Sequence, residues 1–495
     1  MRVAHQVQLR LDCPPIEAVE LNLQCRDEIV PILRALQHLY GDADRRGQLL
    51  DLVGRDVNGS TSRKQGRRGL DYWTIIVLAA VRLGCNLDYD KLQNLAEEHR
   101  TLRFMMGLGD WREEADFDWR RIRDNLGLLR PETLEKLNQL VVGAGHVLAP
   151  EAIEAIRGDT FVVETNVHYP TESGLIGDGL RKVVKLAAEL AARHGQSGRR
   201  QHQHHLKTIK ETVRKIGRAA RAKGLGADRL KPGYQELLDL AEDLLTRARK
   251  LLETLACSMD TEVIDWLGAG LEGPKQKLLH YLQLTRKVCG TAKRRVLLGE
   301  TIANDEKVFS IFEPHTELIK RGKQPDPIQY GHKVLVIEDA AGFICSYRVV
   351  ADGVLDQELL APAMTELQER MGGKITSASF DRGFHTPDNQ KQLAKIVTHP
   401  CIPKKGSVPG REQQEQATVE FRQARQRHPG IESAIGALQS GNGQVRCRDK
   451  GKRGYERYVG LGILGRNLHV LGKLLVAQDD ADGLAGKSKR KPRSG

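Results

Sequence analysis

The sequence lacks the cysteine pattern of a disulfide framework or a zinc site. Its eight cysteines are scattered along 495 residues, and no two of them form a Cys-x-x-Cys pair. In a chain of this length, scattered cysteines are typical of reduced thiols. The sequence therefore argues against a disulfide-stapled or zinc-ribbon protein.

Long apolar runs are also missing. The longest, at 75–81, stops at Arg82, whereas a helix needs about 20 apolar residues to cross a bilayer. The first residues contain no apolar core of a signal peptide. We therefore expect no membrane span and a cytoplasmic protein.

An excess of acidic residues is absent as well. The chain has 77 Lys and Arg against 64 Asp and Glu, which gives a net charge of +13. With 40% hydrophobic residues it can bury several cores, and its length predicts about three domains. The basic balance favours a polyanionic partner such as nucleic acid.

Residues 1–150 are expected to form a helical domain. Apolar residues recur at helical spacing through 73–81, with Asp71 as a candidate N-cap and Gly84 as a candidate end. Arg67 and Arg68 lie just upstream. This region is either a helix-turn-helix-like DNA-binding module or a packing domain with a solvated basic loop.

The rest of the chain alternates between strand and helix patterns. We predict a first core segment at 151–177, a helical insertion at 178–300, the remainder of the core at 301–478 and a disordered basic tail at 479–495. A basic stretch at 199–223 in the insertion either follows DNA phosphates or is a solvated helix face. The core strands and helices are predicted, in order, at 160–167, 308–312, 333–337, 343–350, 359–371, 375–381, 388–395, 396–402, 412–440 (interrupted near 429–430) and 457–476.

Three carboxylates stand at the edges of these core elements. Asp159 lies at a strand start, Asp381 at a strand end, and Glu432 just after Pro429-Gly430 at a helix start. Oxygen ligands of this kind suit Mg²⁺, and carboxylates from separate elements can converge on a pair of ions. Each residue also has a structural interpretation, as a turn, a cap or a helix N-terminal acid.

The local sequence around these acids resembles three blocks of the DDE transposases of bacterial insertion sequences. The first block is GDTFVVETNVHYPTES at 158–173, and the second is SFDRGFHT at 379–386. The third is GIESAI at 430–435, followed by RCRDKG at 446–451 and GRNL at 465–468. The resemblance is to the ISNCY family and spans about 60–475.

This resemblance implies an α/β fold with a ribonuclease-H-like mixed-sheet catalytic core, an N-terminal helical domain and a large helical insertion. It implies that Asp159, Asp381 and Glu432 hold two Mg²⁺ ions, with Mn²⁺ as a substitute. The implied reaction is cleavage at transposon DNA ends followed by strand transfer into target DNA, by a homo-oligomer at the prokaryotic nucleoid. The alternatives are a domesticated, non-catalytic DNA-binding protein and a ribonuclease-H-like nuclease without strand transfer.

Several basic residues are candidate contacts to double-stranded DNA. Related enzymes often carry Tyr-x-x-Arg before the glutamate and a lysine seven residues after it, where this chain has Arg425, His428 and Gln439. A dense basic cluster follows the third acid. The residues that we predict to contact DNA are Arg67, Arg68, Arg425, His428, Arg446, Arg448 and Lys450.

Overall fold

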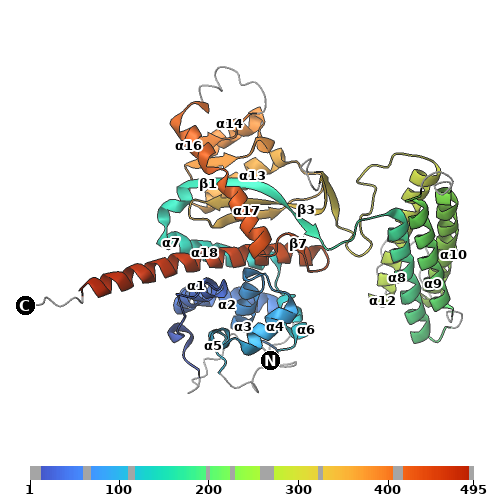
Figure 1. Cartoon of the computed structure of the whole chain (residues 1–495), viewed down its shortest axis with the longest axis horizontal. Helices are drawn as coiled ribbons and strands as arrows, with labels where there is room; N and C mark the ends of the chain where they lie inside the picture. Colours follow the sequence, from blue (N-terminus) through green and yellow to red (C-terminus); the bar gives the residue numbers. More distant parts are fainter. Residues whose placement is uncertain are drawn as a thin grey trace, which may run out of the picture. The chain divides into compact units, whose positions relative to one another are not determined.

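The computed structural model describes residues 13–59, 69–109, 117–196, 201–222, 229–256, 273–320, 327–404 and 416–489 (Figure 1). The chain divides into two compact units. The first unit comprises Met1–Asn166 and Gly331–Gly495, and the second comprises Val167–Tyr330. The second unit is therefore longer than the insertion predicted at 178–300. Its first helix begins at Glu172, and it includes the irregular segment that follows its last helix.

The N-terminal part of the first unit is helical, as predicted. Asp71 is the N-cap that the sequence indicates, since its carboxylate accepts a hydrogen bond of 2.8 Å from the backbone N–H of Thr74. The helices are α1 (Ile29–Gly41), α2 (Ala43–Asn58), α3 (Tyr72–Gly84), α4 (Tyr89–Glu98), α5 (Arg100–Met105), α6 (Trp119–Leu126) and α7 (Pro131–Leu148).

A mixed sheet is built around β1 (Ala155–Thr165). On one side β1 pairs antiparallel with β3 (Ile328–Asp339), which pairs antiparallel with β4 (Ile344–Val349). On the other side β1 pairs in parallel with β5 (Ser377–Phe380), and β5 with β6 (His399–Cys401). The predicted α/β class is confirmed. Two short strands complete the sheet, β2 (Glu317–Lys320) against β3 and β7 (Arg446–Cys447) against β1.

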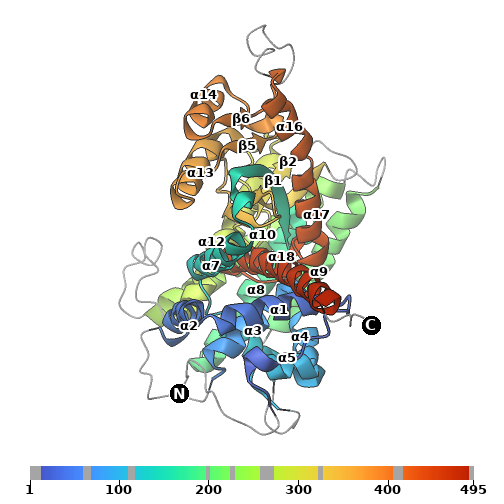
Figure 2. The ribbon, with the colours of Figure 1, turned by 90° about the vertical axis from the view of Figure 1, so that its left-hand side faces the viewer.

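Helices cover both faces of this sheet (Figure 2). α13 (Asp356–Arg370) and α14 (Pro387–Ile396) lie on one face, and α16 (Val419–Arg427) and α17 (Gly430–Gly441) lie on the other. The predicted interruption near 429–430 is therefore correct. The strand predicted at 308–312 is wrong, because this segment is irregular and buries Phe309 and Ile311 without pairing in the sheet.

The last helix, α18 (Lys452–Lys489), joins the N-terminal helices to the sheet. It packs against α1, α3 and α7, so the N-terminal helices and the sheet share one hydrophobic core. The 1–150 region is consequently not a separate body. The predicted tail at 479–495 is also corrected, because the helix continues to Lys489.

Part of α18 is apolar enough to be tested as a membrane span. From Lys452 to Ala481 it is the one helix among the described residues with the necessary length and composition. However, 72% of its most apolar window is buried inside the protein. This burial is typical of the core helix of a folded domain.

The second unit is a helical bundle with its own apolar core. It consists of α8 (Glu172–Arg193), α9 (His202–Ala219), α10 (Leu230–Ala256) and α12 (Gly273–Ala292). α8 packs against all three other helices, and α10 packs against both α9 and α12. The core is formed by apolar side chains such as Leu180, Ile209, Ile216, Leu244 and Leu282.

The crossing of α3 and α18 depends on two glycines. A Cβ built on Gly465 would lie 2.6 Å from the backbone Cα of Gly84, closer than any side chain can approach. We therefore expect Gly465→Ala to lower the free energy of unfolding by about 1–3 kcal/mol through overpacking. The check is chemical denaturation of both proteins.

The matched control is Gly143→Ala on α7, an exposed helical glycine whose added Cβ would meet nothing within 4 Å. This change should be neutral or stabilising by up to about 1 kcal/mol, because alanine favours the helix. If the two substitutions changed the free energy of unfolding equally, close backbone contact between Gly84 and Gly465 would not limit the packing of α3 on α18.

Candidate functional site

The parallel pairing of β1 and β5 brings the first two acids together. Arg157 is the partner of Ser379 and Gly158 the partner of Phe380, so the next position sets Asp159 beside Asp381. Asp381 is the first residue after β5 and is exposed. Asp159 is half-buried and lies inside β1, so its predicted position at the start of a strand is wrong, because β1 begins four residues earlier, at Ala155. The Asp159 carboxylate accepts a hydrogen bond of 2.7 Å from the Thr160 N–H. Two carboxylates thus stand next to each other at the end of β5.

The third acid reaches the same face of the sheet on α17. Arg157 lies two residues before Asp159, and alternate strand residues share a face. The Arg157 guanidinium donates a hydrogen bond of 3.0 Å to the carbonyl of Arg427, and a Cβ on Gly430 would lie only 2.0 Å from it. Since α17 packs on β1, its first turn, with the exposed Glu432, lies on the side of the sheet that carries Asp159. Among the described residues, however, the three carboxylates do not form a group whose ligand atoms are close enough to hold one metal ion.

The His428 side chain lies close to β5 and to two of the three acids. Its Nδ1 lies 3.3 Å from the Ser379 hydroxyl on β5. Burial lowers the pKa of His428, and the Asp381 carboxylate opposes this shift, as does Glu432. His428 is therefore a half-buried imidazole with two of the predicted catalytic acids close to it.

The sequence interpretation missed the ion pair beneath these acids. Arg157 binds Glu338 on β3, with a guanidinium-to-carboxylate distance of 2.6 Å. The Glu338 side chain is only 2% exposed, and burial raises its pKa while Arg157 opposes this shift. The signal was the alternation along β1, which places Arg157 on the face of Asp159.

The residues predicted to contact DNA fall into different groups. Arg425 on α16 and Lys450 before α18 are exposed, and neither forms an ion pair within the part of the chain that the structure describes. Arg446 is bound to Glu164 at 2.8 Å, and Arg448 bonds to Asn86 at 2.7 Å. Arg425 and Lys450 are thus the better placed to bind phosphate. Arg67 and Arg68 lie outside the described residues.

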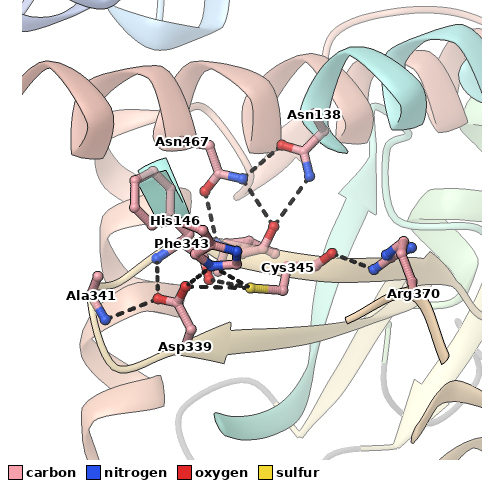
Figure 3. A network of polar contacts seen from close by, with 9 residues as sticks. Asn138, His146, Asp339, Ala341, Phe343, Cys345, Arg370 and Asn467 are labelled. Atoms are coloured by element: carbon pink, nitrogen blue, oxygen red, sulfur yellow. Dashed lines mark hydrogen bonds and ion pairs between the residues drawn. The ribbon is translucent and has the colours of Figure 1, made fainter. Parts of the chain in front are cut away.

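A second polar cluster lies at the hairpin of β3 and β4 (Figure 3). His146, Asp339 and Cys345 place ligand-type atoms within 4.8 Å of one another, so the group could hold a metal ion. The Asp339 carboxylate accepts hydrogen bonds from the backbone N–H groups of Ala341 and Phe343. It also lies 2.7 Å from His146 Nε2 and accepts a 3.5 Å hydrogen bond from the Cys345 thiol.

These distances indicate a hydrogen-bonded network. Two ligands of one tetrahedral Zn²⁺ at about 2.0–2.1 Å lie roughly 3.3 Å apart, which is farther than the distance from His146 to Asp339. Cys345 approaches the same imidazole nitrogen at 4.0 Å, so the group is also not a nucleophile–base–acid relay through both ring nitrogens. Its role here is to hold the β3–β4 turn against α7.

Comparison with protein families, curated proteins and solved structures finds no match to this chain. Its function is therefore inferred from the residues and the geometry above.

The network at Asp339 predicts a stability effect. Asp339→Asn replaces one of the two acceptor oxygens by an NH2 group, which can only donate. In one orientation this group faces the N–H groups of Ala341 and Phe343, and in the other it faces His146 and Cys345. We expect a loss of about 3 kcal/mol in unfolding free energy. Denaturant unfolding measures it, with the exposed Asp352→Asn as the control.

The same experiment tests the metal alternative. Added Zn²⁺ or a chelator should leave the melting temperature of the wild type unchanged. A Zn²⁺-dependent increase in melting temperature that disappears in Asp339→Asn would instead identify a metal site.

Proposed function

We propose that the chain is a DDE transposase that cleaves transposon DNA ends and joins them to target DNA. The observation that carries the proposal is the parallel register of β1 and β5, which sets Asp159 beside Asp381 on the face over which Glu432 lies. This register joins two carboxylates that are 222 positions apart in sequence, and the packing of α17 on β1 brings the helix that carries Glu432 to the same strand. The resemblance of the same three sequence blocks to insertion-sequence transposases names the chemistry.

The strand arrangement supports a ribonuclease-H-like core as part of this proposal. The first strand lies between an antiparallel pair, β3 and β4, and two parallel strands, β5 and β6. The acids then stand on the first strand, at the end of the adjacent parallel strand and on the helix that covers them. This order of strands agrees with the ribonuclease-H-like core that the sequence resemblance implies.

The donor set suits Mg²⁺. All three groups are carboxylates, and hard divalent cations prefer oxygen ligands. Asp159, Asp381 and Glu432 would hold the ions, and Mn²⁺ could replace Mg²⁺. When bound, a pair of such ions activates the attacking oxygen and stabilises the leaving oxygen of a phosphoryl transfer.

The chain's own residues would bind and orient the DNA. Arg425 and Lys450 offer exposed cations to phosphate. His428 offers a half-buried imidazole beside Asp381 and Glu432, and its ring nitrogens can accept or donate a hydrogen bond. Arg157 is bound to Glu338 and the Arg427 carbonyl, and we assign it to positioning α17.

The first test is cleavage of the DNA that flanks this protein's own gene. We expect discrete cuts in Mg²⁺ or Mn²⁺ and none in EDTA. Asp159→Asn, Asp381→Asn and Glu432→Gln should each reduce cleavage about a thousandfold, because each removes several kcal/mol of charge stabilisation. DNA binding should be retained. Asp388→Asn, an exposed acid on α14, should cut normally.

The products separate the alternatives. Specific binding without any cutting would identify a domesticated DNA-binding protein. Cutting without joining to target DNA would identify a nuclease. Loss of binding in the acid variants would show that these residues are structural.

DNA affinity should also depend on the two exposed cations without an ion-pair partner among the described residues, Arg425 and Lys450. Each phosphate contact contributes about −0.9 to the slope of log affinity against log salt. Arg425→Gln and Lys450→Gln should each reduce the magnitude of the slope by about one, as measured by fluorescence anisotropy. Lys395→Gln on α14, an exposed cation on the opposite face of the sheet, should leave it unchanged. An equal effect of all three would contradict this placement.

A further inference from the structure

A row of cations lies along the outer face of α9 in the second unit. Lys207, Lys210, Arg214 and Arg218 are exposed and recur at steps of three and four residues. At 3.6 residues per turn they fall within an arc of about 80° and extend over about 16 Å. We call these four residues the α9 stripe. Its arc is opposite the buried face of the helix, which is formed by Ile209, Thr212, Ile216 and Ala219.

The charges of the α9 stripe are not neutralised within the described part of the chain. None of the four forms an ion pair there, whereas Lys215 on the flank of the helix pairs with Glu236 of α10 at 3.2 Å. Glu211 is the one acidic residue of α9 and lies at the edge of the arc. Neighbouring like charges at these spacings destabilise an isolated helix. The stripe therefore needs an explanation other than helix stability.

An ordinary solvated helix face in the same bundle looks different. On α10, the exposed Arg247 pairs with Asp243, one turn before it, at 2.8 Å, and the largely buried Arg249 pairs with Glu253 at 2.9 Å. Cations of α10 thus have acidic partners on their own helix. The contrast within one bundle indicates that α9 presents its positive charge to a polyanion.

The dimensions suit the backbone of double-stranded DNA. One strand of a duplex carries a phosphate for each 3.4 Å of rise along the axis, so a stripe of about 16 Å is long enough to meet several phosphates. Lysine and arginine side chains from one helix face can reach such a row without touching the bases, which gives affinity without sequence preference.

We propose that the α9 stripe is a second DNA-binding surface, which contacts the phosphate backbone of duplex DNA outside the catalytic site. The proposal deepens the transposase function and rests on it for the identity of the polyanion. It assigns the insertion the role of holding DNA, without a part in the phosphoryl transfer. The other candidate partners, an anionic membrane or an acidic surface of a second copy, are outcomes of the test.

The test compares two full-length variants of equal net charge. One removes the stripe (K207Q/K210Q/R214Q/R218Q). The other removes four exposed cations at the start of α10 or along it (R229Q/K231Q/R247Q/K250Q). Affinity for a 40-base-pair duplex of unrelated sequence is measured across a salt series. Circular dichroism and melting temperature confirm that both variants fold, as we expect for exposed side chains.

The stripe variant should reduce the magnitude of the salt slope by about three to four, and its affinity at low salt should fall at least tenfold. The α10 variant should change the slope by less than about one. Equal slopes in the two variants, or no change in either, would overturn the proposal. The proposal would also be overturned if the stripe variant bound duplex DNA normally but no longer bound phosphatidylserine-containing vesicles. The same holds if it bound duplex DNA normally but no longer self-associated.

Cleavage by the wild type separates this proposal from the proposed function. If the wild type cuts its end DNA and the stripe variant binds DNA normally, only the stripe proposal fails. If the stripe variant loses affinity but the wild type never cuts DNA, the stripe stands as a DNA-binding surface and the transposase proposal fails.

Discussion

The register of β1 against its two neighbours determines the whole candidate site. On one side it places Asp159 beside Asp381, and on the other it places Arg157 directly opposite Glu338. Glu338 is buried, so a shift of one residue would leave its charge without the Arg157 partner and turn every β1 side chain to the wrong face. The ion pair thus stabilises the one register in which Asp159 lies beside Asp381.

The same pairing explains how a large insertion is tolerated inside the core. Glu164 at the end of β1 pairs with Gly331 at the start of the first unit's part of β3. The 164 residues of the second unit therefore leave and return at neighbouring points of the sheet. The entropy of closing a loop rises only with the logarithm of its length, and the insertion has a core of its own. The strands of the first unit can pair without regard to what lies between them.

Much of this organisation was predictable from local sequence patterns. The strand at 343–350, the cap at Asp71 and the Pro429-Gly430 break are all specified by nearby residues, and the structure agrees with each. The same is true of the strand that ends at Asp381.

What local patterns could not show depends on contacts between distant segments. The apolar residues at 308–312 read as a strand, but they are buried without a strand partner. The N-terminal helices pack against α18 through small residues such as Gly84 and Gly465, which are 381 positions apart in the sequence. Likewise, the structural role of Arg157 depends on its ion pair with Glu338, which lies on another strand. The sequence could suggest three acids, but only the register shows that Asp159 and Asp381 are neighbours.

A buried ion pair ties the N-terminal helices to the candidate site. Arg82 on α3 binds the Asp449 carboxylate with both terminal nitrogens, and the two side chains are 1% and 6% exposed. The Arg82 guanidinium also stacks 3.9 Å from the ring centre of Tyr89. Asp449 lies between Arg448 and Lys450, in the basic segment that follows β7. Separating α3 from this segment would leave a charge buried without a partner, which is strongly unfavourable. Any DNA held by the N-terminal helices or by Lys450 is therefore held by the same body that carries the three acids. The α9 stripe belongs to a unit with a separate core, so its DNA contacts can change without disturbing that body.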